Sequence, residues 1–294
     1  MPPLLAVPNV SEGRDRAAIE AIGDAFVAGG ACLLDVHVDP DHHRSVFTLA
    51  GAPGALADAV LAGAREALAR VDLHTHSGVH PCVGALDVAP IVHIDRAARG
   101  AACAEALVLG DLLGRELKLP VLLYGPLAAG RARADLRRGG LEVLAGRLRA
   151  GELRPDFGPA QASPRSGVTL VAARAPLVAF NLELAPPTSG ADARLVAARV
   201  REGGEEGLPG VRAIGLELAA RGVAQVSFNV EDPERTPLAA VVQAVRRHVP
   251  VTAGELVGLA PAAAFDGFPG DVALPGFEPG RHLIERALGS QPDH

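Results

Sequence analysis

The segment ACLLDVHVDPDHHRSVFTLAG, residues 31–51, holds two consecutive strand-like stretches, 31–38 and 45–51, separated by a short polar turn. Apolar residues at helical spacing flank this pair, over residues 16–28 before it and 54–71 after it. A strand-like stretch at 4–8 precedes the first helix, and another at 83–94 follows the second. The order strand, helix, strand, strand, helix, strand predicts a ferredoxin-like βαββαβ unit.

The second half of the chain repeats this order. Its predicted elements are a strand at 177–184, a helix at 192–202, strands at 211–218 and 223–229, a helix at 237–249 and a strand at 256–259. Between the two series lie a helix at 101–117, a strand at 121–124, an Arg-rich helical stretch at 131–153 and a strand at 167–173. We therefore predict an α/β (α+β) protein of two tandem ferredoxin-like subdomains, residues 1–175 and 176–294, with a ligand groove between them.

Composition excludes several classes of function. The chain has 294 residues, is 49% hydrophobic and carries a net charge of −6, without a basic run interleaved with aromatics, so a nucleic-acid partner is not expected. It has neither a signal-peptide pattern nor about 18 consecutive apolar residues, so no membrane association is expected. The 3 cysteines include no Cys-x-x-Cys pair, which favours a reducing, cytoplasmic setting over disulfides or a thiolate zinc site.

The histidine-rich stretch HTHSGVHPCVGALDV, residues 74–88, runs from a polar loop into an apolar strand. Because histidine titrates near neutral pH, His80 on this Gly- and Pro-bounded loop is a candidate proton carrier. The other nearby histidines are expected to be surface or supporting groups, and Asp87 is expected either to bond backbone or to orient the imidazole; these histidines are His42, His74, His76 and His93. His74-x-His76 is a metal-ligand spacing, but further ligands are not found at later strand ends, so no metal site is predicted.

Three other polar segments carry candidate binding groups. In VPNVSEGR, residues 7–14, Ser11 and Glu12 predict an N-cap and its capping-box partner, while Asn9 and Arg14 are open to other roles. DVHVDPDHHR, residues 35–44, concentrates titratable side chains in one turn. DFGPAQASPRSG, residues 156–167, is a loop of small residues whose backbone is suited to wrap a planar ligand.

Together these segments resemble the formiminotransferases, also called glutamate formimidoyltransferases. VPNVSEGR resembles the family's N-terminal signature, DHHRSVFT from Asp41 is similar to its Asp-His-Asn-Arg-Ser/Thr-Val segment, and HPCVGALDV from His80 resembles its His-Pro-Arg-Met-Gly-Ala-Leu-Asp-Val core. In the second half, AFNLEL, AIGLEL, AQVSFN and ELVGLAP also fit. The resemblance runs from about Leu5 to Pro261 and covers the transferase part of the family, without a cyclodeaminase domain.

The resemblance implies transfer of the formimino group of N-formiminoglutamate to N5 of tetrahydrofolate, in histidine degradation and one-carbon metabolism. Tetrahydrofolate is then a co-substrate, no metal is needed, and a cytoplasmic homodimer is expected. The family's catalytic histidine falls on His80, as general acid and base. Substrate carboxylates or charges would be held by Asn9, Asp39, Asp41 and Arg44. The folate-lining loop falls on Gly158, Pro159, Ala160, Gln161, Ala162, Ser163, Pro164, Arg165, Ser166 and Gly167.

Two positions beside His80 differ from the family pattern. Members usually carry Glu before the histidine and Arg after the proline, where this chain has Val79 and Cys82. His43 stands in place of Asn, and Arg165 in place of an aromatic residue. These differences leave two alternatives open: a formyl transferase acting on N-formylglutamate, and a catalytically silent folate-binding or regulatory protein on the same scaffold.

Overall fold

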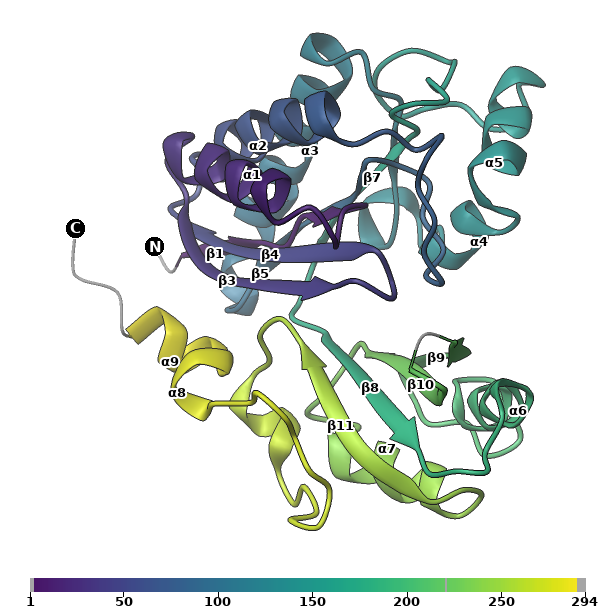
Figure 1. Cartoon of the computed structure of the whole chain (residues 1–294). Coiled ribbons are helices and arrows are strands. Elements are labelled where there is room, and N and C mark those ends of the chain that lie inside the picture. The colour runs from purple at the N-terminus through teal and green to yellow at the C-terminus, as the bar shows by residue number, and fades with distance from the viewer. Residues whose placement is uncertain (1–2, 220, 290–294) are drawn as a thin grey trace. The chain divides into compact units, whose positions relative to one another are not determined.

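The computed structural model describes residues 3–219 and 221–289 (Figure 1). The chain divides into two compact units, Met1–Ala175 and Pro176–His294. Each unit has its own sheet and its own buried apolar cluster among the described residues.

The first unit begins with a ferredoxin-like set of elements. They are β1 (Leu4–Ala6), β2 (Asn9–Val10), α1 (Arg16–Ala28), β3 (Cys32–Asp39), β4 (Arg44–Gly51), α2 (Leu56–Arg70) and β5 (Leu86–His93). The short strands β1 and β2 both lie between β4 and β5, and β3 pairs with the outer side of β4, all antiparallel. This order, β3-β4-β1/β2-β5, is the predicted βαββαβ topology.

The predicted first strand, residues 4–8, ends at Ala6 as β1, and a second short strand, β2, follows at Asn9–Val10 because the ladder is interrupted around Pro8. Proline has no N–H to donate, and its carbonyl instead accepts from Phe47 N at 3.0 Å. The chain resumes pairing at Asn9, opposite Val46 of β4. This interruption brings the segment that follows β2 beside the β3–β4 turn.

The first unit then extends its sheet with parallel strands. The elements are η1 (Arg96–Ala98), α3 (Arg99–Glu116), β6 (Val121–Leu123), η2 (Pro126–Ala128), α4 (Arg133–Arg137), α5 (Gly140–Arg149) and β7 (Thr169–Arg174). β7 pairs in parallel with β5, and β6 with β7. The single helix predicted over 131–153 is wrong, since Gly139 (φ 80°) and Gly140 (φ 73°) interrupt it and leave α4 and α5.

The two faces of this sheet are covered by different helices. α1, α2 and α3 lie together on one face (Figure 1), where they form the main apolar cluster with residues such as Phe26, Phe47 and Leu109. A smaller cluster on alternate strand residues, such as Val88 and Leu170, packs against Leu136 of α4 and Leu144 and Leu148 of α5. α4 is thereby fixed close to the start of β5.

The second unit is a complete ferredoxin-like fold. Its elements are β8 (Val178–Leu184), α6 (Gly190–Val200), β9 (Val211–Leu218), β10 (Val223–Val230), α7 (Leu238–Arg246) and β11 (Val251–Val257). The sheet is antiparallel in the order β11-β8-β10-β9, as predicted. After it come η3 (Ala262–Phe265), α8 (Pro279–His282) and α9 (Ile284–Gly289). Across the described residues, no helix combines the length and apolar character needed to cross a membrane.

Candidate functional site

Three chain segments of the first unit meet at the β3–β4 turn. They are the segment after β2, the turn itself at residues 40–43, and the loop at 72–85 before β5. Two glycines make this approach possible: a Cβ on Gly13 would lie 2.3 Å from Asp39 O, and one on Gly78 would lie 2.3 Å from His42 O. Because no side chain fits at either position, the sequence must keep glycine there for the segments to meet.

Arg14 links the three segments. Its Nε donates to Pro40 O at 3.0 Å, and its Nη2 donates to Ser77 O at 2.9 Å. Ser45 on β4 adds a further bond, since its hydroxyl donates to Glu12 O at 2.6 Å. Arg14, whose role the sequence left open, therefore holds the loop that carries His80 against the β3–β4 turn.

The capping role predicted for Ser11 and Glu12 is wrong. The N-cap of α1 is Asp15, whose side chain accepts from Ala18 N at 3.1 Å. The Ser11 hydroxyl instead donates to Gly84 O at 2.7 Å, across to the start of β5. The Glu12 carboxylate accepts from the backbone N–H groups of Arg14 and Asp15. α1 begins at Arg16, as predicted, but the segment before it packs onto the His80 loop, so Asp15 and not Ser11 caps the helix.

His80 contacts Arg44, which begins β4. Arg44 Nη1 lies 3.1 Å from His80 Nε2. An arginine side chain can only donate, so Nε2 accepts and the neutral ring carries its proton on Nδ1. That Nδ1 is buried and has no hydrogen-bond partner among the described residues. The second imidazole nearby is His42, whose ring centroid is 5.7 Å away.

The surroundings of His80 keep its imidazole neutral. Burial, followed by the positive charges of Arg44 and Arg137, holds the pKa of His80 well below its usual value of 6.5. At neutral pH the ring is therefore unprotonated and able to accept a proton. This is the state that a general base requires.

Asp87 anchors the loop rather than the imidazole. Its side chain is 0% exposed, and Oδ1 accepts from Val83 N at 2.8 Å. Its Oδ2 forms an ion pair with Arg137 at the end of α4. Of the two roles expected for Asp87, bonding backbone is the one observed. Arg137 was not among the candidate residues of the sequence analysis, because it is one of several arginines in residues 131–153.

Cys82 and His76 form a second pair beside His80. Cys82 Sγ lies 3.8 Å from His76 Nδ1, and His76 Nε2 lies 3.0 Å from His43 O. Because a carbonyl only accepts, Nε2 carries the ring proton and Nδ1 presents its lone pair to the thiol. The rings of His76 and His43 stack with centroids 4.6 Å apart, and His43 Nδ1 accepts from Gly13 N at 3.1 Å.

Burial is the largest effect on His43. It lowers the pKa of that imidazole, with Glu12 acting in the opposite direction. The neutral ring suits the bond that Nδ1 accepts from Gly13. His43, which takes the place of an expected Asn, thus retains a hydrogen-bond acceptor toward the segment after β2.

The remaining histidines divide between surface and interior. His74 is exposed and pairs with Asp72, as expected for a surface group. His42 is 1% exposed and His93 is 8% exposed, so a surface location is wrong for both. His42 Nδ1 lies 3.0 Å from Asp39 Oδ2 and supports the β3–β4 turn.

The predicted substrate-binding residues have different surroundings. Asn9 is 9% exposed and its amide donates to Val7 O at 3.0 Å. Asp39 Oδ1 accepts from Asp41 N and His42 N at 2.9 and 2.8 Å, which closes the turn. Asp41 O accepts from Val79 N at 3.3 Å. Arg44, the fourth, is hydrogen-bonded to His80.

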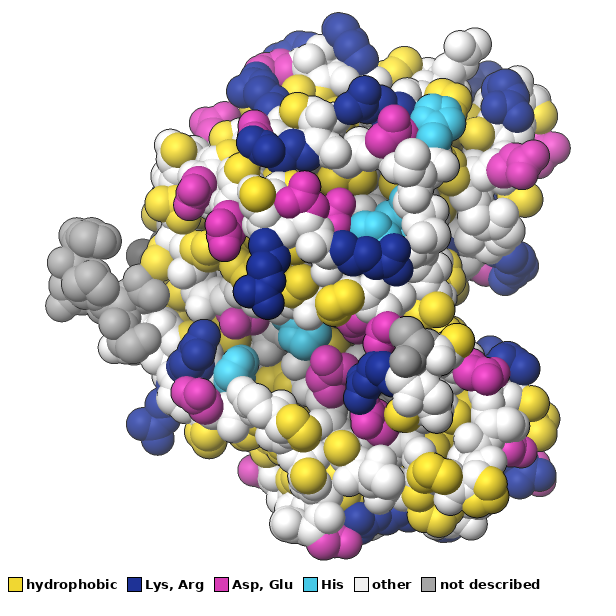
Figure 2. All heavy atoms as spheres, viewed as in Figure 1, with side chains coloured by type: hydrophobic (Ala, Val, Ile, Leu, Met, Phe, Trp, Pro, Cys, Tyr) yellow, Lys and Arg dark blue, Asp and Glu magenta, His cyan; other side chains and the backbone are white. Residues whose placement is uncertain are grey.

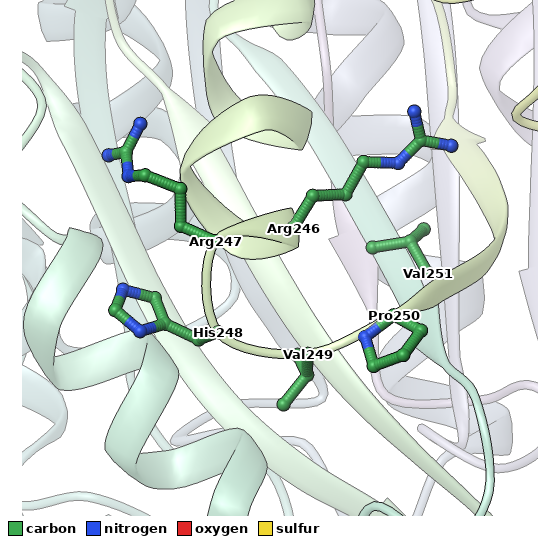
Figure 3. Close-up of a pocket in the computed structure, with 6 residues that line it drawn as sticks. All are labelled: Arg246, Arg247, His248, Val249, Pro250 and Val251. Carbon is green, nitrogen blue, oxygen red and sulfur yellow. The ribbon is translucent and has the colours of Figure 1, made fainter.

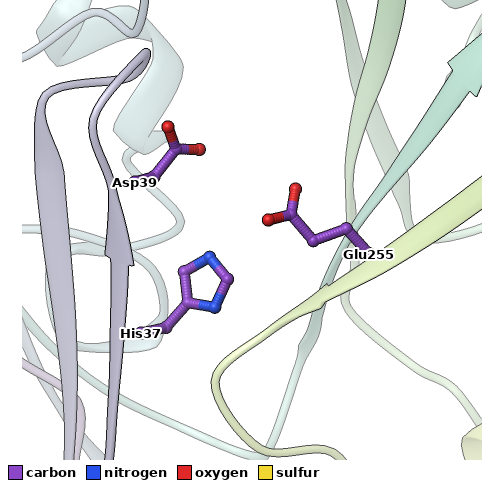
Figure 4. Close-up of side chains that lie close together, drawn as sticks. All are labelled: His37, Asp39 and Glu255. Atoms are coloured by element: carbon purple, nitrogen blue, oxygen red, sulfur yellow. The ribbon is translucent and has the colours of Figure 1, made fainter. Parts of the chain in front are cut away.

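Figure 4 shows how side chains project from two of the strands. His37 and Asp39 are two residues apart on β3, so they share one face of that strand. Glu255, also drawn there, belongs to β11 of the second unit. Within that unit its carboxylate accepts from the Asn181 amide of β8 at 2.9 Å.

The predicted folate loop, residues 158–167, is tied at both ends. At its start, Gly158 (φ 79°) lies so close to Leu119 that a Cβ would be 2.0 Å from Leu119 O. At its end, Ser166 O accepts from Ala85 N at 2.9 Å, just after the His80 loop. Much of the span between is exposed to solvent, including Ala160, Gln161, Ser163, Pro164 and Arg165.

The second unit has a separate open hollow at the turn between α7 and β11 (Figure 3). It encloses about 420 Å³ and is lined by the consecutive residues Arg246, Arg247, His248, Val249, Pro250 and Val251. Arg246 pairs with Asp271, and Arg247 with Glu206. No residue predicted to bind substrate lines it.

On the face seen in Figure 2, acidic and basic side chains are interspersed.

These features define an α/β protein of two ferredoxin-like units, in the first of which the neutral His80 lies beside Arg44 of β4, and Arg137 of α4 is tied through Asp87 to the loop that carries His80. Residues 4–174 match the formiminotransferase domain, N-terminal subdomain, and residues 179–266 match the formiminotransferase domain. The chain belongs to the formiminotransferase family.

Curated relatives agree with this assignment. The chain is 35% identical to a glutamate formimidoyltransferase of Streptococcus pyogenes serotype M1, covering 88% of this chain and 89% of the relative. It is 32% identical to a glutamate formimidoyltransferase of Thermoplasma acidophilum, with 96% of each chain covered. It is also 37% identical to the formimidoyltransferase-cyclodeaminase of Rattus norvegicus, but spans only 50% of that longer protein.

Proposed function

We propose that this chain is a glutamate formimidoyltransferase that moves the formimino group of N-formiminoglutamate to N5 of tetrahydrofolate. The observation that carries the proposal is the neutral imidazole of His80, which is hydrogen-bonded to Arg44. The loop that carries His80 is also bonded, just before β5, to the predicted folate loop. The two relatives of similar length, from Streptococcus pyogenes and Thermoplasma acidophilum, are both named glutamate formimidoyltransferase, which supports the proposal.

The chemistry needs one group that first accepts and then donates a proton. The N5 amine adds to the formimino carbon and forms a C–N bond, and the tetrahedral intermediate passes the N5 proton to Nε2 of His80. The imidazolium then gives that proton to the glutamate nitrogen, whose C–N bond to the formimino carbon breaks. The lowered pKa of His80 suits both steps, because the ring begins neutral and its protonated form is a strong acid.

Arg44 is placed to exchange its bond to His80 for a bond to a substrate carboxylate. Its guanidinium is bonded to Nε2, the nitrogen assigned to proton transfer. A substrate carboxylate is a stronger partner for a guanidinium than a neutral ring nitrogen is. Binding of that carboxylate to Arg44 would leave the Nε2 lone pair available to the N5 proton.

The other assignments follow from the same reading. Residues 158–167 are proposed to bind tetrahydrofolate, with no metal required. Asn9, Asp39 and Asp41 are proposed to help hold or orient the substrate: Asp39 and Asp41 belong to the β3–β4 turn, and Asn9 is bonded to Val7 O in the neighbouring segment. We also propose that the active protein is a cytoplasmic homodimer.

The first experiment is spectrophotometric detection of 5-formiminotetrahydrofolate from purified protein, N-formiminoglutamate and tetrahydrofolate. His80→Ala should lower kcat by about 10²- to 10⁴-fold, the usual contribution of a positioned acid–base group. His74→Ala, at an exposed histidine on the same loop, is the matched control and should retain activity.

The same assay separates the two alternatives from the main proposal. Turnover with N-formylglutamate in place of the formimino donor would indicate the formyl transferase. Tetrahydrofolate binding without turnover of either donor would indicate a silent binding protein. The names of the relatives favour the formimino reaction over both.

A further inference from the structure

Arg137 is a buried cation that the proposed mechanism does not use. It ends α4, its side chain is 11% exposed, and its Nη2 pairs with Asp87. Its Nε is buried and has no hydrogen-bond partner among the described residues. A guanidinium nitrogen bears a proton that always seeks an acceptor, so this N–H donor is available to a bound group.

The pair with Asp87 fixes this cation beside His80. Asp87 also accepts from Val83 N, three residues after His80, so one carboxylate joins α4 to the His80 loop. The charge of Arg137 reaches the imidazole, since it is among the groups that lower the pKa of His80. Arg137 also lies near Cys82, the position after Pro81.

Arg44 and Arg137 are close enough to repel each other. Burial, and then the charge of Arg44, lower the pKa of Arg137 to about 9, so the side chain still carries its charge at neutral pH. Two guanidinium groups brought together with little water are stabilised when a carboxylate is placed between them. The side chain of His80 lies in contact with one of the two, at 3.1 Å.

We propose that Arg137 binds the α-carboxylate of the formimino donor and so positions the scissile C–N bond against His80. This inference rests on the proposed function for the identity of the donor. In N-formiminoglutamate the α-carboxylate is attached to the carbon that bears the departing nitrogen, so it must lie close to the proton carrier. The terminal carboxylate and the glutamate tail of the folate lie farther from the reacting atoms.

The test compares two donors in the parent protein and in Arg137→Lys. Lysine keeps a cation for Asp87 but lacks the Nε–H of arginine. With N-formiminoglutamate, the variant should raise KM about 10- to 100-fold, the usual effect of losing a hydrogen bond to a charged group, with KM for tetrahydrofolate unchanged. With a donor analogue in which an amide replaces the α-carboxylate, the parent should already have a high KM, and Arg137→Lys should raise that KM little further.

Arg138→Lys is the matched control. Arg138 is the next residue, its side chain is 80% exposed, and it pairs with Asp135, so both KM values should stay at the parent level. The second variant is Arg137→Gln, assayed with and without added guanidinium ion. A return of KM for N-formiminoglutamate toward the parent value when the ion is added would support the assignment. A merely structural role predicts equal losses with both donors in the lysine variant, which would overturn the proposal.

Failure of the inference is distinguishable from failure of the proposed function. Parent turnover, measured first, tests the function. If the parent does not turn over, calorimetric binding of N-formiminoglutamate to the parent and to Arg137→Lys still reports the carboxylate contact. Equal affinity of the two proteins for that donor would overturn the role of Arg137.

Discussion

His80 is neutral because it is buried and because its neighbours carry positive charge. Desolvation disfavours the imidazolium most, and Arg44 and Arg137 disfavour it further. A group with a depressed pKa loses its neutral form only when the pH falls below its ordinary value. The acid limb of kcat/KM in the free enzyme should therefore lie below pH 6.5.

Arg44→Gln tests this electrostatic account. Removing a positive charge makes protonation of the ring easier, so the pKa of His80 should rise and the acid limb should move to higher pH. Because Arg44 is also assigned to substrate binding, NMR titration of His80 in the protein without substrate is the decisive readout. Arg138→Gln is the control, and an unchanged His80 titration in Arg44→Gln would contradict the account.

Sequence reasoning found His80 and Arg44 because both lie within continuous family motifs. It missed Arg137 because residues 131–153 contain several arginines with similar neighbours in sequence. Arg137 is buried at 11% exposure while the adjacent Arg138 is exposed at 80%, and only tertiary packing separates them. The pairing of Cys82 with His76 was missed for the same reason, since each was read alone.

At the scale of elements, α2 depends on a residue from another helix. Its N-cap, Ala55, has no side chain that can accept a hydrogen bond. Glu105 of α3, which is 5% exposed, accepts instead from Gly54 N at 2.5 Å and from Ala57 N at 2.7 Å. This carboxylate thus performs the capping that the sequence next to α2 does not provide.

Glu105→Ala should destabilise the protein by about 1–3 kcal/mol, because it leaves the buried Ala57 N–H without an acceptor and removes the bond to Gly54 N. The measurement is urea unfolding followed by circular dichroism. Asp111→Ala on the same helix removes an exposed pair with Arg115 and should change stability by less than about 1 kcal/mol. Equal effects of the two substitutions would show that Glu105 does not cap α2.

Helix and strand order could be predicted, whereas the residues that cap the helices and tie down the segments between elements could not. Helical spacing of apolar residues located α1, α2 and α3, but Ser11 followed by Glu12 resembled a cap that Asp15 provides. Ser11 donates to Gly84, 73 residues away, and no local pattern predicts such a bond. The split between α4 and α5 was missed because glycine pairs inside a helical pattern do not always break it.

At the scale of the whole molecule, the repeated order of elements predicted two ferredoxin-like units, and both topologies are confirmed. The place of β6 and β7 could not be predicted, because an apolar strand gives no indication of which edge of a sheet it joins. Each unit also has its own apolar cluster, with no residue in common.

Separate cores predict separate effects of core substitutions. Phe228 of β10 is 1% exposed, and Phe228→Ala should destabilise the second unit by about 3–5 kcal/mol. Hydrogen exchange of the intact chain should then show faster exchange in β8, β10 and β11, with β1, β4 and β5 retaining their protection. Leu195→Ala, at a side chain that is 66% exposed on α6, is the control. Equally faster exchange in both units would contradict independent cores.

The end of the predicted folate loop is held by backbone groups, through Ala85 N to Ser166 O and Val168 N to Val83 O. Such bonds do not depend on which side chain occupies a position, provided that it is not proline at a donor. Mutations can therefore accumulate along the exposed part of this loop over evolutionary time without releasing its end from the segment after His80. Arg165 lies in this exposed part, and its carbonyl accepts from Leu73 N at 3.0 Å through backbone atoms alone. The exposed part of the loop can thus change its side chains, and with them its contacts to any bound ligand, while the backbone bonds beside the His80 loop stay in place.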